Sequence, residues 1–200
     1  MTPSLPHLPE LQWTGAEGDA AYDDGTLTLR CAGGVDWTND AAGGPGQHAA
    51  TALAFAAPDG DFTLSARVRV PGERSTFDAG ALALWSSTER WAKVCNEYSP
   101  QGESMVVSVV TNGFSDDANG AVFAADAVFL RLARTGPAFA FHSSLDGEVW
   151  HFLRLFRLDA DPSTIAVGFL AQAPMGAGAT AVFDEIRLER SSLRDLRDLS

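Results

Sequence analysis

Residues 77–86 read FDAGALALWS, residues 90–99 read RWAKVCNEYS and residues 103–112 read ESMVVSVVTN. Apolar residues recur at every second position in all three runs, and this period is typical of β-strands. Only short polar segments separate the runs, whereas parallel strands need a crossover connection of a dozen or more residues. The stretch therefore predicts three consecutive antiparallel strands.

The rest of the chain extends this pattern to an all-β architecture. Turn residues such as Pro71-Gly72, Gly136-Pro137 and Asp146-Gly147 separate further alternating runs. These runs predict strands over 11–14, 26–31, 51–56, 61–70, 128–134, 138–145, 150–157, 165–173 and 180–189. Each sheet then has an apolar face to bury, so a two-sheet antiparallel sandwich is the economical packing.

We expect residues 1–190 to form a single sandwich domain and residues 191–200 to form a short C-terminal helical tail. Leucines recur there at three-residue spacing (Leu193, Leu196, Leu199), and serines that can cap a helix precede them.

Composition excludes several classes of partner. The 200-residue chain has a formal net charge of −12, which repels both nucleic acid and anionic lipid. No run is long and apolar enough to span a membrane, and residues 1–13 lack the features of a secretion signal. We expect a cytoplasmic protein in which Cys31 and Cys95 are buried free thiols, with no metal and no cofactor.

Residues 90–99 place a polar group on one face of a strand. Alternation puts Trp91, Lys93, Cys95 and Glu97 on the same side, and Lys93 is the only lysine in the chain. One interpretation is an ion pair between Lys93 and Glu97 along the strand. The other is a ligand cleft in which Trp91 stacks on the ligand and the two charged groups form hydrogen bonds with it.

Two further strand residues are candidates for the same cleft. Arg154 is co-facial with three aromatic residues, and Gln172 ends an apolar strand. A polar side chain in such a position needs a partner when it is buried.

Two loops contribute the remaining polar candidates. Trp37 and Asn39 lie in the glycine-rich segment 33–50, either as a sugar platform or as an anchor that packs against the sandwich. Asp116 and Asp117 follow a Thr-Asn-Gly sequence, either as a turn cap or as groups that bind a sugar hydroxyl or a cation. One pair of acids does not provide the six or more oxygens that calcium requires, so we predict no metal.

Three strings carry a family resemblance: FDAGALALWSSTERWAKVCNEYSPQGESMVVSVVTNGFSDD, RLARTGPAFAFHSSLDGEVWHFLRLFRL and VGFLAQAPMGAGATAVFDEI. They resemble the "regulation of enolase" family of the concanavalin A-like lectin/glucanase superfamily, from about residue 35 to residue 186. The resemblance implies a jelly-roll-like sandwich of two curved sheets. It implies little about activity, because the family is largely uncharacterised and the superfamily holds lectins, hydrolases, lyases and interaction domains.

The sequence favours a binding function over catalysis. Hydrolases of this superfamily usually carry an E-x-D-x-x-E pattern on one strand, and Glu97 is the only acid in residues 90–99. We therefore expect a non-catalytic module that binds a carbohydrate or similar polyhydroxylated molecule. Two alternatives stay open: a regulatory protein-interaction domain that docks through its sandwich edge or C-terminal helix, and a glycoside hydrolase or lyase that uses Glu97 with Asp78 or Asp116.

Overall fold

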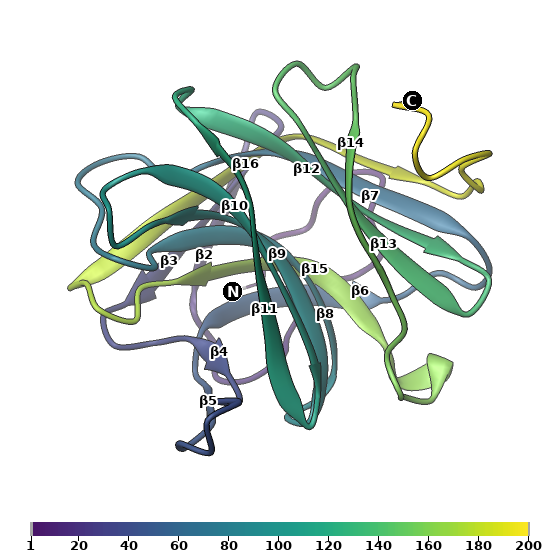
Figure 1. Ribbon diagram of the computed structural model, residues 1–200. Helices are drawn as coiled ribbons and strands as arrows, with labels where there is room; N and C mark the ends of the chain where they lie inside the picture. The colour runs from purple at the N-terminus through teal and green to yellow at the C-terminus, as the bar shows by residue number, and fades with distance from the viewer. Residues whose placement is uncertain (1, 200) are drawn as a thin grey trace.

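Two antiparallel sheets of seven strands each make up the computed structural model, which describes residues 2–199 (Figure 1). Sheet 1 contains, in spatial order, β1 (Gln12–Trp13), β6 (Thr51–Ala56), β15 (Ala166–Gln172), β8 (Ala79–Ser87), β9 (Arg90–Tyr98), β10 (Ser104–Asn112) and β11 (Phe114–Phe123). Sheet 2 contains β14 (His151–Phe156), β13 (Ala138–Ser144), β12 (Ala127–Thr135), β7 (Phe62–Arg69), β16 (Gly178–Glu189), β3 (Thr26–Ala32) and β2 (Asp19–Asp23). A two-stranded ribbon, β4 (Trp37–Thr38) with β5 (Gln47–His48), and a 3-10 turn at Pro162–Thr164 complete the fold.

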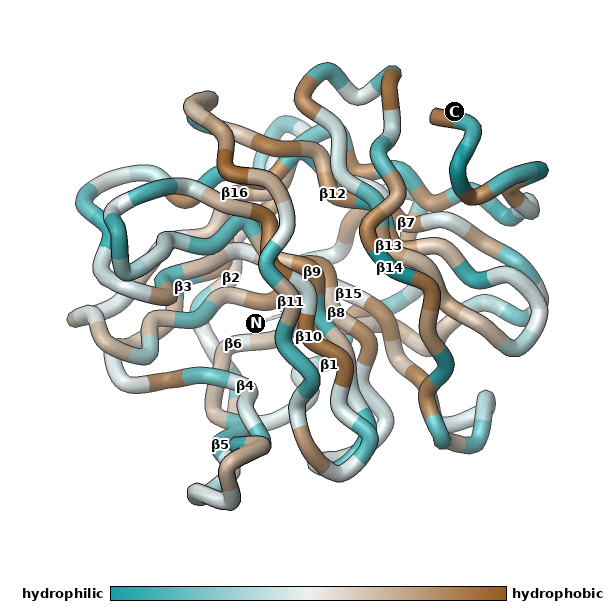
Figure 2. Tube along the Cα trace, in the orientation of Figure 1, coloured by the Kyte–Doolittle hydropathy of each residue, from teal (hydrophilic) through white to brown (hydrophobic). Residues whose placement is uncertain are grey.

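The core lies between the inner faces of the two sheets. On β7, Leu64, Ala66 and Val68 are fully buried, while the alternating Ser65 and Arg67 are partly exposed. The rings of Phe169 on sheet 1 and Phe183 on sheet 2 meet with their centroids 5.1 Å apart. Figure 2 shows hydrophobic residues concentrated along the strands and hydrophilic residues in many of the connections. Burial of these alternating apolar side chains holds the sandwich together.

The predicted all-β, jelly-roll-like sandwich is confirmed, and the predicted strands form at nearly the expected positions. The prediction missed β2, the β4–β5 ribbon and β11. In particular, Asp116 and Asp117 lie inside β11, where Asp117 pairs with Val109 of β10, so the interpretation as a turn cap is wrong. Polar and small residues fill β11, and its alternation is therefore weak because the strand is a largely exposed sheet edge.

The C-terminal helix is also wrong: residues 191–199 are irregular, and residue 200 lies outside the described residues. This segment instead packs against sheet 2, where the Leu196 carbonyl bonds His142 Nε2 at 3.0 Å and the Leu199 carbonyl accepts from the Trp150 N–H at 3.0 Å. The guanidinium of Arg197 lies 4.1 Å from the centre of the Phe152 ring. A helix this short is marginal on its own, so contacts with the sheet decide its conformation.

Each sheet thus has an outer face that is covered by a segment outside the two large sheets. Residues 33–50, which include β4 and β5, lie against sheet 1, and the C-terminal segment lies against sheet 2 (Figure 1). No helix in residues 2–199 is long and apolar enough to cross a membrane.

Candidate functional site

A polar pocket of about 260 Å³ opens on the outer face of sheet 1, beside the 33–50 loop. Strands β9, β10, β11 and β15 form its floor and walls, and the loop and the segment just before β8 contribute its rim. The lining residues are Asp36, Trp37, Thr38, Phe77, Lys93, Glu97, Val107, Val109, Asp117, Asn119 and Gln172.

Lys93 lies at the floor, 3% exposed, and all three of its ammonium protons have acceptors. Its Nζ donates to Asp36 Oδ1 at 2.8 Å, to the Trp37 carbonyl at 2.8 Å and to Gln172 Oε1 at 2.7 Å. Burial would lower the pKa of this ammonium, but Asp36 and the other acidic groups outweigh burial and raise it. Lys93 therefore stays charged and fastens the loop to the sheet, and the predicted ion pair along the strand with Glu97 gives way to one with Asp36.

Glu97 is 8% exposed and has a single, long hydrogen bond, with Gln172 Nε2 3.4 Å from its Oε2. Burial raises the pKa of the Glu97 carboxyl to about 7, against the attraction of Lys93 and with added repulsion from Asp36 and Asp117. The same Gln172 Nε2 donates to the Phe77 carbonyl at 3.0 Å. Gln172 thus connects Lys93, Glu97 and Phe77, and its predicted place in the cleft agrees with the geometry.

Asp117 and Asn119 face the same pocket from β11. Asp117 pairs with Val109, which pairs with Lys93, so the three side chains share one face of sheet 1. Partial burial raises the pKa of Asp117, and the nearby Asp36 and Asp116 add to this effect against the attraction of Lys93. Sequence reasoning missed Asn119, because nothing in the apparent loop after residue 113 indicated an edge strand.

Phe77 forms the rim in a backbone conformation that bulky residues rarely adopt, with φ = 67°. Its N–H donates to the Tyr98 carbonyl at 2.7 Å and its carbonyl accepts from Gln172, which holds the residue in place. The side chain is 39% exposed. Strain of this kind is concentrated at ligand sites, and here it presents an aromatic ring at the pocket mouth.

The tryptophans and Asn39 anchor the loop instead of meeting a ligand. Trp37 is 2% exposed and Trp91 fully buried, with ring centroids 5.8 Å apart, so neither offers the predicted open stacking surface. Asn39 donates to the Thr88 and Gly113 carbonyls, and its Oδ1 pairs with His48 Nε2 and the Trp91 indole N–H. The indoles are buried because the loop folds over them, which strand alternation alone could not reveal.

Asp78, Asp116 and Arg154 do not line the pocket. Ala79 pairs with Glu97, so the neighbouring Asp78 faces the opposite side of sheet 1, where it accepts from the Ser75 N–H. Asp116 likewise alternates with Asp117 and forms an ion pair with Arg154 of β14 at 2.9 Å. Neither predicted carboxyl pair, Glu97 with Asp78 or Glu97 with Asp116, can flank one bond within the pocket.

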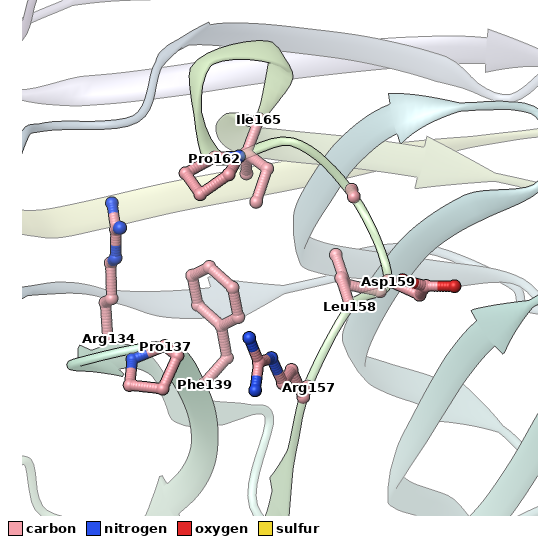
Figure 3. Close-up of a pocket in the computed structure, with 9 residues that line it drawn as sticks. Arg134, Pro137, Phe139, Arg157, Leu158, Asp159, Pro162 and Ile165 are labelled. Atoms are coloured by element: carbon pink, nitrogen blue, oxygen red, sulfur yellow. The ribbon is translucent and has the colours of Figure 1, made fainter.

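A second hollow, of about 280 Å³, lies between the β12–β13 turn and the segment after β14 (Figure 3). Its floor is apolar, with Phe139, Leu158 and Ile165, and Arg134 and Arg157 lie beside the Phe139 ring. None of the predicted site residues lies there. Within residues 2–199, no group of three or more His, Cys, Asp and Glu side chains could hold a metal ion.

The two packed antiparallel sheets define an all-β protein with a jelly-roll-like sandwich fold. Residues 13–191 match the family model described as "Protein of unknown function (DUF1349)", so the chain belongs to that family. No curated protein matches the chain.

Solved structures share the fold. A functionally unknown protein from Saccharomyces cerevisiae is 24% identical with a TM-score of 0.81, and the match covers 92% of this chain and 97% of the yeast chain. The carbohydrate-binding module CBM66 from Bacillus subtilis is 14% identical with a TM-score of 0.60, covering 94% of this chain and 99% of the module. A bifunctional GH43-CE protein from Bacteroides eggerthii is 18% identical with a TM-score of 0.70, covering 94% of this chain but 24% of its own length.

Proposed function

We propose that the pocket beside Lys93 binds a small polyhydroxylated molecule, such as a sugar, without converting it. The observation that carries this proposal is the convergence of Glu97, Asp117 and Asn119 from two strands on one pocket. Carboxylates accept hydrogen bonds from hydroxyl groups and an amide both donates and accepts, which is the mixture that sugar hydroxyls require. The exposed Phe77 ring can pack against the C–H face of such a ligand.

The size of the pocket favours a small ligand. Its volume of about 260 Å³ lies just below the range of about 300–1,000 Å³ that is usual for small-molecule sites. We expect one sugar ring, or a polyol of similar size, to occupy it. The fold shared with the B. subtilis carbohydrate-binding module supports this ligand class.

The two remaining acids face the pocket from separate strands. Asp117 lies two strands from Lys93, and Lys93 lies four residues from Glu97. These separations place the two acidic backbones ~16 Å apart, with both side chains directed into the pocket between them. We infer that Glu97 and Asp117 hold a ligand from two sides.

The test is ligand binding by the wild type, Glu97→Gln and a control, Glu10→Gln, whose carboxyl is exposed and far from the pocket in sequence. A ligand at a hundredfold excess over its Kd adds about 2.7 kcal/mol to the unfolding free energy. At ~2–4 °C per kcal/mol, a screen of neutral and charged sugars and polyols should show a clear thermal shift. The proposal predicts a shift in wild type and control that is much smaller in Glu97→Gln. A panel without any shift, on folded protein, would refute it.

A second candidate, a regulatory protein-interaction domain, is favoured by exposed apolar side chains beside the β11 edge. Val122 is 52% exposed and Leu145 63% exposed, and both line an apolar hollow of about 490 Å³. The resemblance to the "regulation of enolase" family is part of this second candidate function. Capture of a partner that Leu145→Asp abolishes and Glu97→Gln leaves unchanged would favour it over ligand binding.

A cytoplasmic location is also part of the proposal. Cys31 and Cys95 are both buried free thiols, as expected from the sequence, and this state fits a reducing compartment. The net charge of −12 supports neutral or cationic partners over nucleic acid and anionic lipid.

A further inference from the structure

The charges that line the pocket do not balance. Lys93 is the only cation in its lining, and its 2.8 Å ion pair with Asp36 already neutralises it. Glu97 and Asp117 remain as two further acids that face the same space. A neutral sugar would leave both charges uncompensated once it displaced the water around them.

This excess of negative charge is clearest at Glu97. The side chain is more than nine-tenths buried and lines the cavity, yet its Oε1 has no hydrogen-bond partner among residues 2–199, and its Oε2 has one at 3.4 Å. A buried carboxylate ordinarily has two or more donors or a paired cation. Glu97 Oε1 is open to the pocket, so its donors come from there, either from water or from a ligand.

We propose that the ligand of this pocket carries a protonated amine among its hydroxyls, as an amino sugar or an aminated polyol does. The inference rests on the proposed function, because it specifies the ligand of the same site. An ammonium beside Glu97 supplies up to three donors for its carboxylate oxygens, while the hydroxyls bind Asp117 and Asn119. A charged hydrogen bond to a buried carboxylate is stronger than a neutral one.

The rim favours an organic cation over a metal ion. The Phe77 ring is held at the pocket mouth and exposed, where an ammonium or its C–H groups can lie against its face. Two carboxylates and one amide fall short of the six or more oxygens that calcium requires. An amine, by contrast, needs only two or three acceptors.

Several groups face Glu97 and set its charge. Lys93 and Cys95 lie on the same strand, Asp36 on the loop, Asp117 on β11, and Arg74 on the segment before β8. Burial and the two aspartates raise the pKa of Glu97 to about 7, while Lys93 and Arg74 oppose them. Amine binding should therefore strengthen as the pH rises through about 7 and Glu97 loses its proton.

The experiment compares matched probes by isothermal titration calorimetry: glucosamine with glucose, galactosamine with galactose, and N-methylglucamine with sorbitol. Each amine should bind at least about tenfold more tightly than its neutral counterpart, the effect of about 1.4 kcal/mol of charge attraction. For N-methylglucamine, whose amine stays protonated, the affinity should fall about tenfold from one pH unit above to one unit below the Glu97 pKa. Glu97→Gln should remove both the preference and the pH dependence, Asp117→Asn should weaken the preference, and Glu10→Gln should change neither.

The outcomes separate this inference from the proposed function. Neutral probes that bind as tightly as their amines would overturn the inference and leave the binding function intact. An amine preference that survives both Glu97→Gln and Asp117→Asn would also overturn it, because the amine would then bind elsewhere. Failure of every amine and every neutral probe would refute both.

Discussion

The outer faces of the two sheets differ in how they accommodate a buried positive charge. Each has a buried cation on a strand and a covering segment: Lys93 under the 33–50 loop on sheet 1, and Arg131 under the C-terminal segment on sheet 2. Acids outweigh burial at Lys93 and raise its pKa, whereas burial outweighs acids at Arg131 and lowers its pKa to about 10. Sheet 1 is thus arranged to hold charge beside an open pocket.

The difference extends to the neighbouring groups. On sheet 2, Arg131 lies 4.4 Å from the centre of the Trp150 ring, and the fully buried His142 bonds the Leu196 carbonyl. On sheet 1, Glu97 lies beside the fully partnered Lys93 with one of its own oxygens unbonded. One face is closed by packing, and on the other Glu97 lines an open pocket.

The largest expected effect separates the two cations. Lys93→Met leaves Asp36 and Gln172 without their central donor, so we expect the unfolding free energy to fall by about 3–4 kcal/mol. Arg131→Met removes a cation that burial disfavours but also loses its contact with the Trp150 ring, so we expect a smaller loss of about 1–2 kcal/mol. Chemical denaturation of both variants measures the two losses of unfolding free energy. Equal losses would contradict the claim that the two buried cations contribute differently to stability.

Glu97 should make the protein less stable as the pH rises. Its carboxyl has a pKa of 4.5 when unperturbed and about 7 in the fold, so the native state binds the extra proton in this interval. The contribution of Glu97 to the unfolding free energy should therefore fall by about 3 kcal/mol as the pH rises from 4.5 through about 7. Glu97→Gln should remove this contribution and be more stable than the wild type above this interval. A variant with the same pH dependence of stability as the wild type would contradict this assignment.

His142 should act in the opposite direction. Burial, with the nearby Arg131, lowers the pKa of its imidazole from 6.5 to about 4, so the unfolded chain binds the proton first. This contribution should remove about 3 kcal/mol as the pH falls from 6.5 to about 4. In the wild type, the contributions of Glu97 and His142 to the unfolding free energy then change in opposite directions and nearly cancel over the pH range that they share. His142→Gln should expose the slope of Glu97 alone, and Glu97→Gln the slope of His142 alone, in denaturation curves recorded across this range.

Removal of residues 191–200 should affect only sheet 2. The deletion uncovers His142 and Trp150, and we expect a loss of about 1–2 kcal/mol from the broken hydrogen bonds and exposed apolar surface. Ligand affinity at the sheet 1 pocket should not change. A ligand affinity that falls with the deletion, on protein shown to be folded, would show that the two faces are coupled.

The smallest effect on stability should come from Phe77→Gly. Glycine adopts the positive φ of this position without strain, so the change should cost little and can stabilise by up to about 1 kcal/mol. The same change removes the ring at the pocket mouth and should weaken ligand binding several-fold. Unaltered binding would assign Phe77 a purely structural role.

Much of the sandwich could be predicted from local patterns, because β3 or β7 shows its buried face in its own alternation. Strand β11 could not, because an exposed edge strand needs no apolar face and shows no period. Of the residues singled out from the sequence, five line the candidate pocket: Lys93, Glu97, Gln172, Asp117 and Trp37. Asp36 and Phe77 were missed, because a loop contact 57 residues away and a strained φ leave no sequence signal.

An NMR titration of the backbone amides with N-methylglucamine tests most directly whether sheet 1 carries a ligand site. We expect saturable shifts that cluster at Phe77, Glu97, Asp117 and Asn119 and spare His142 and the second hollow around Phe139. Shifts centred on Phe139 and Arg157, or on the covered face of sheet 2, would contradict it, as would the absence of any saturable shift.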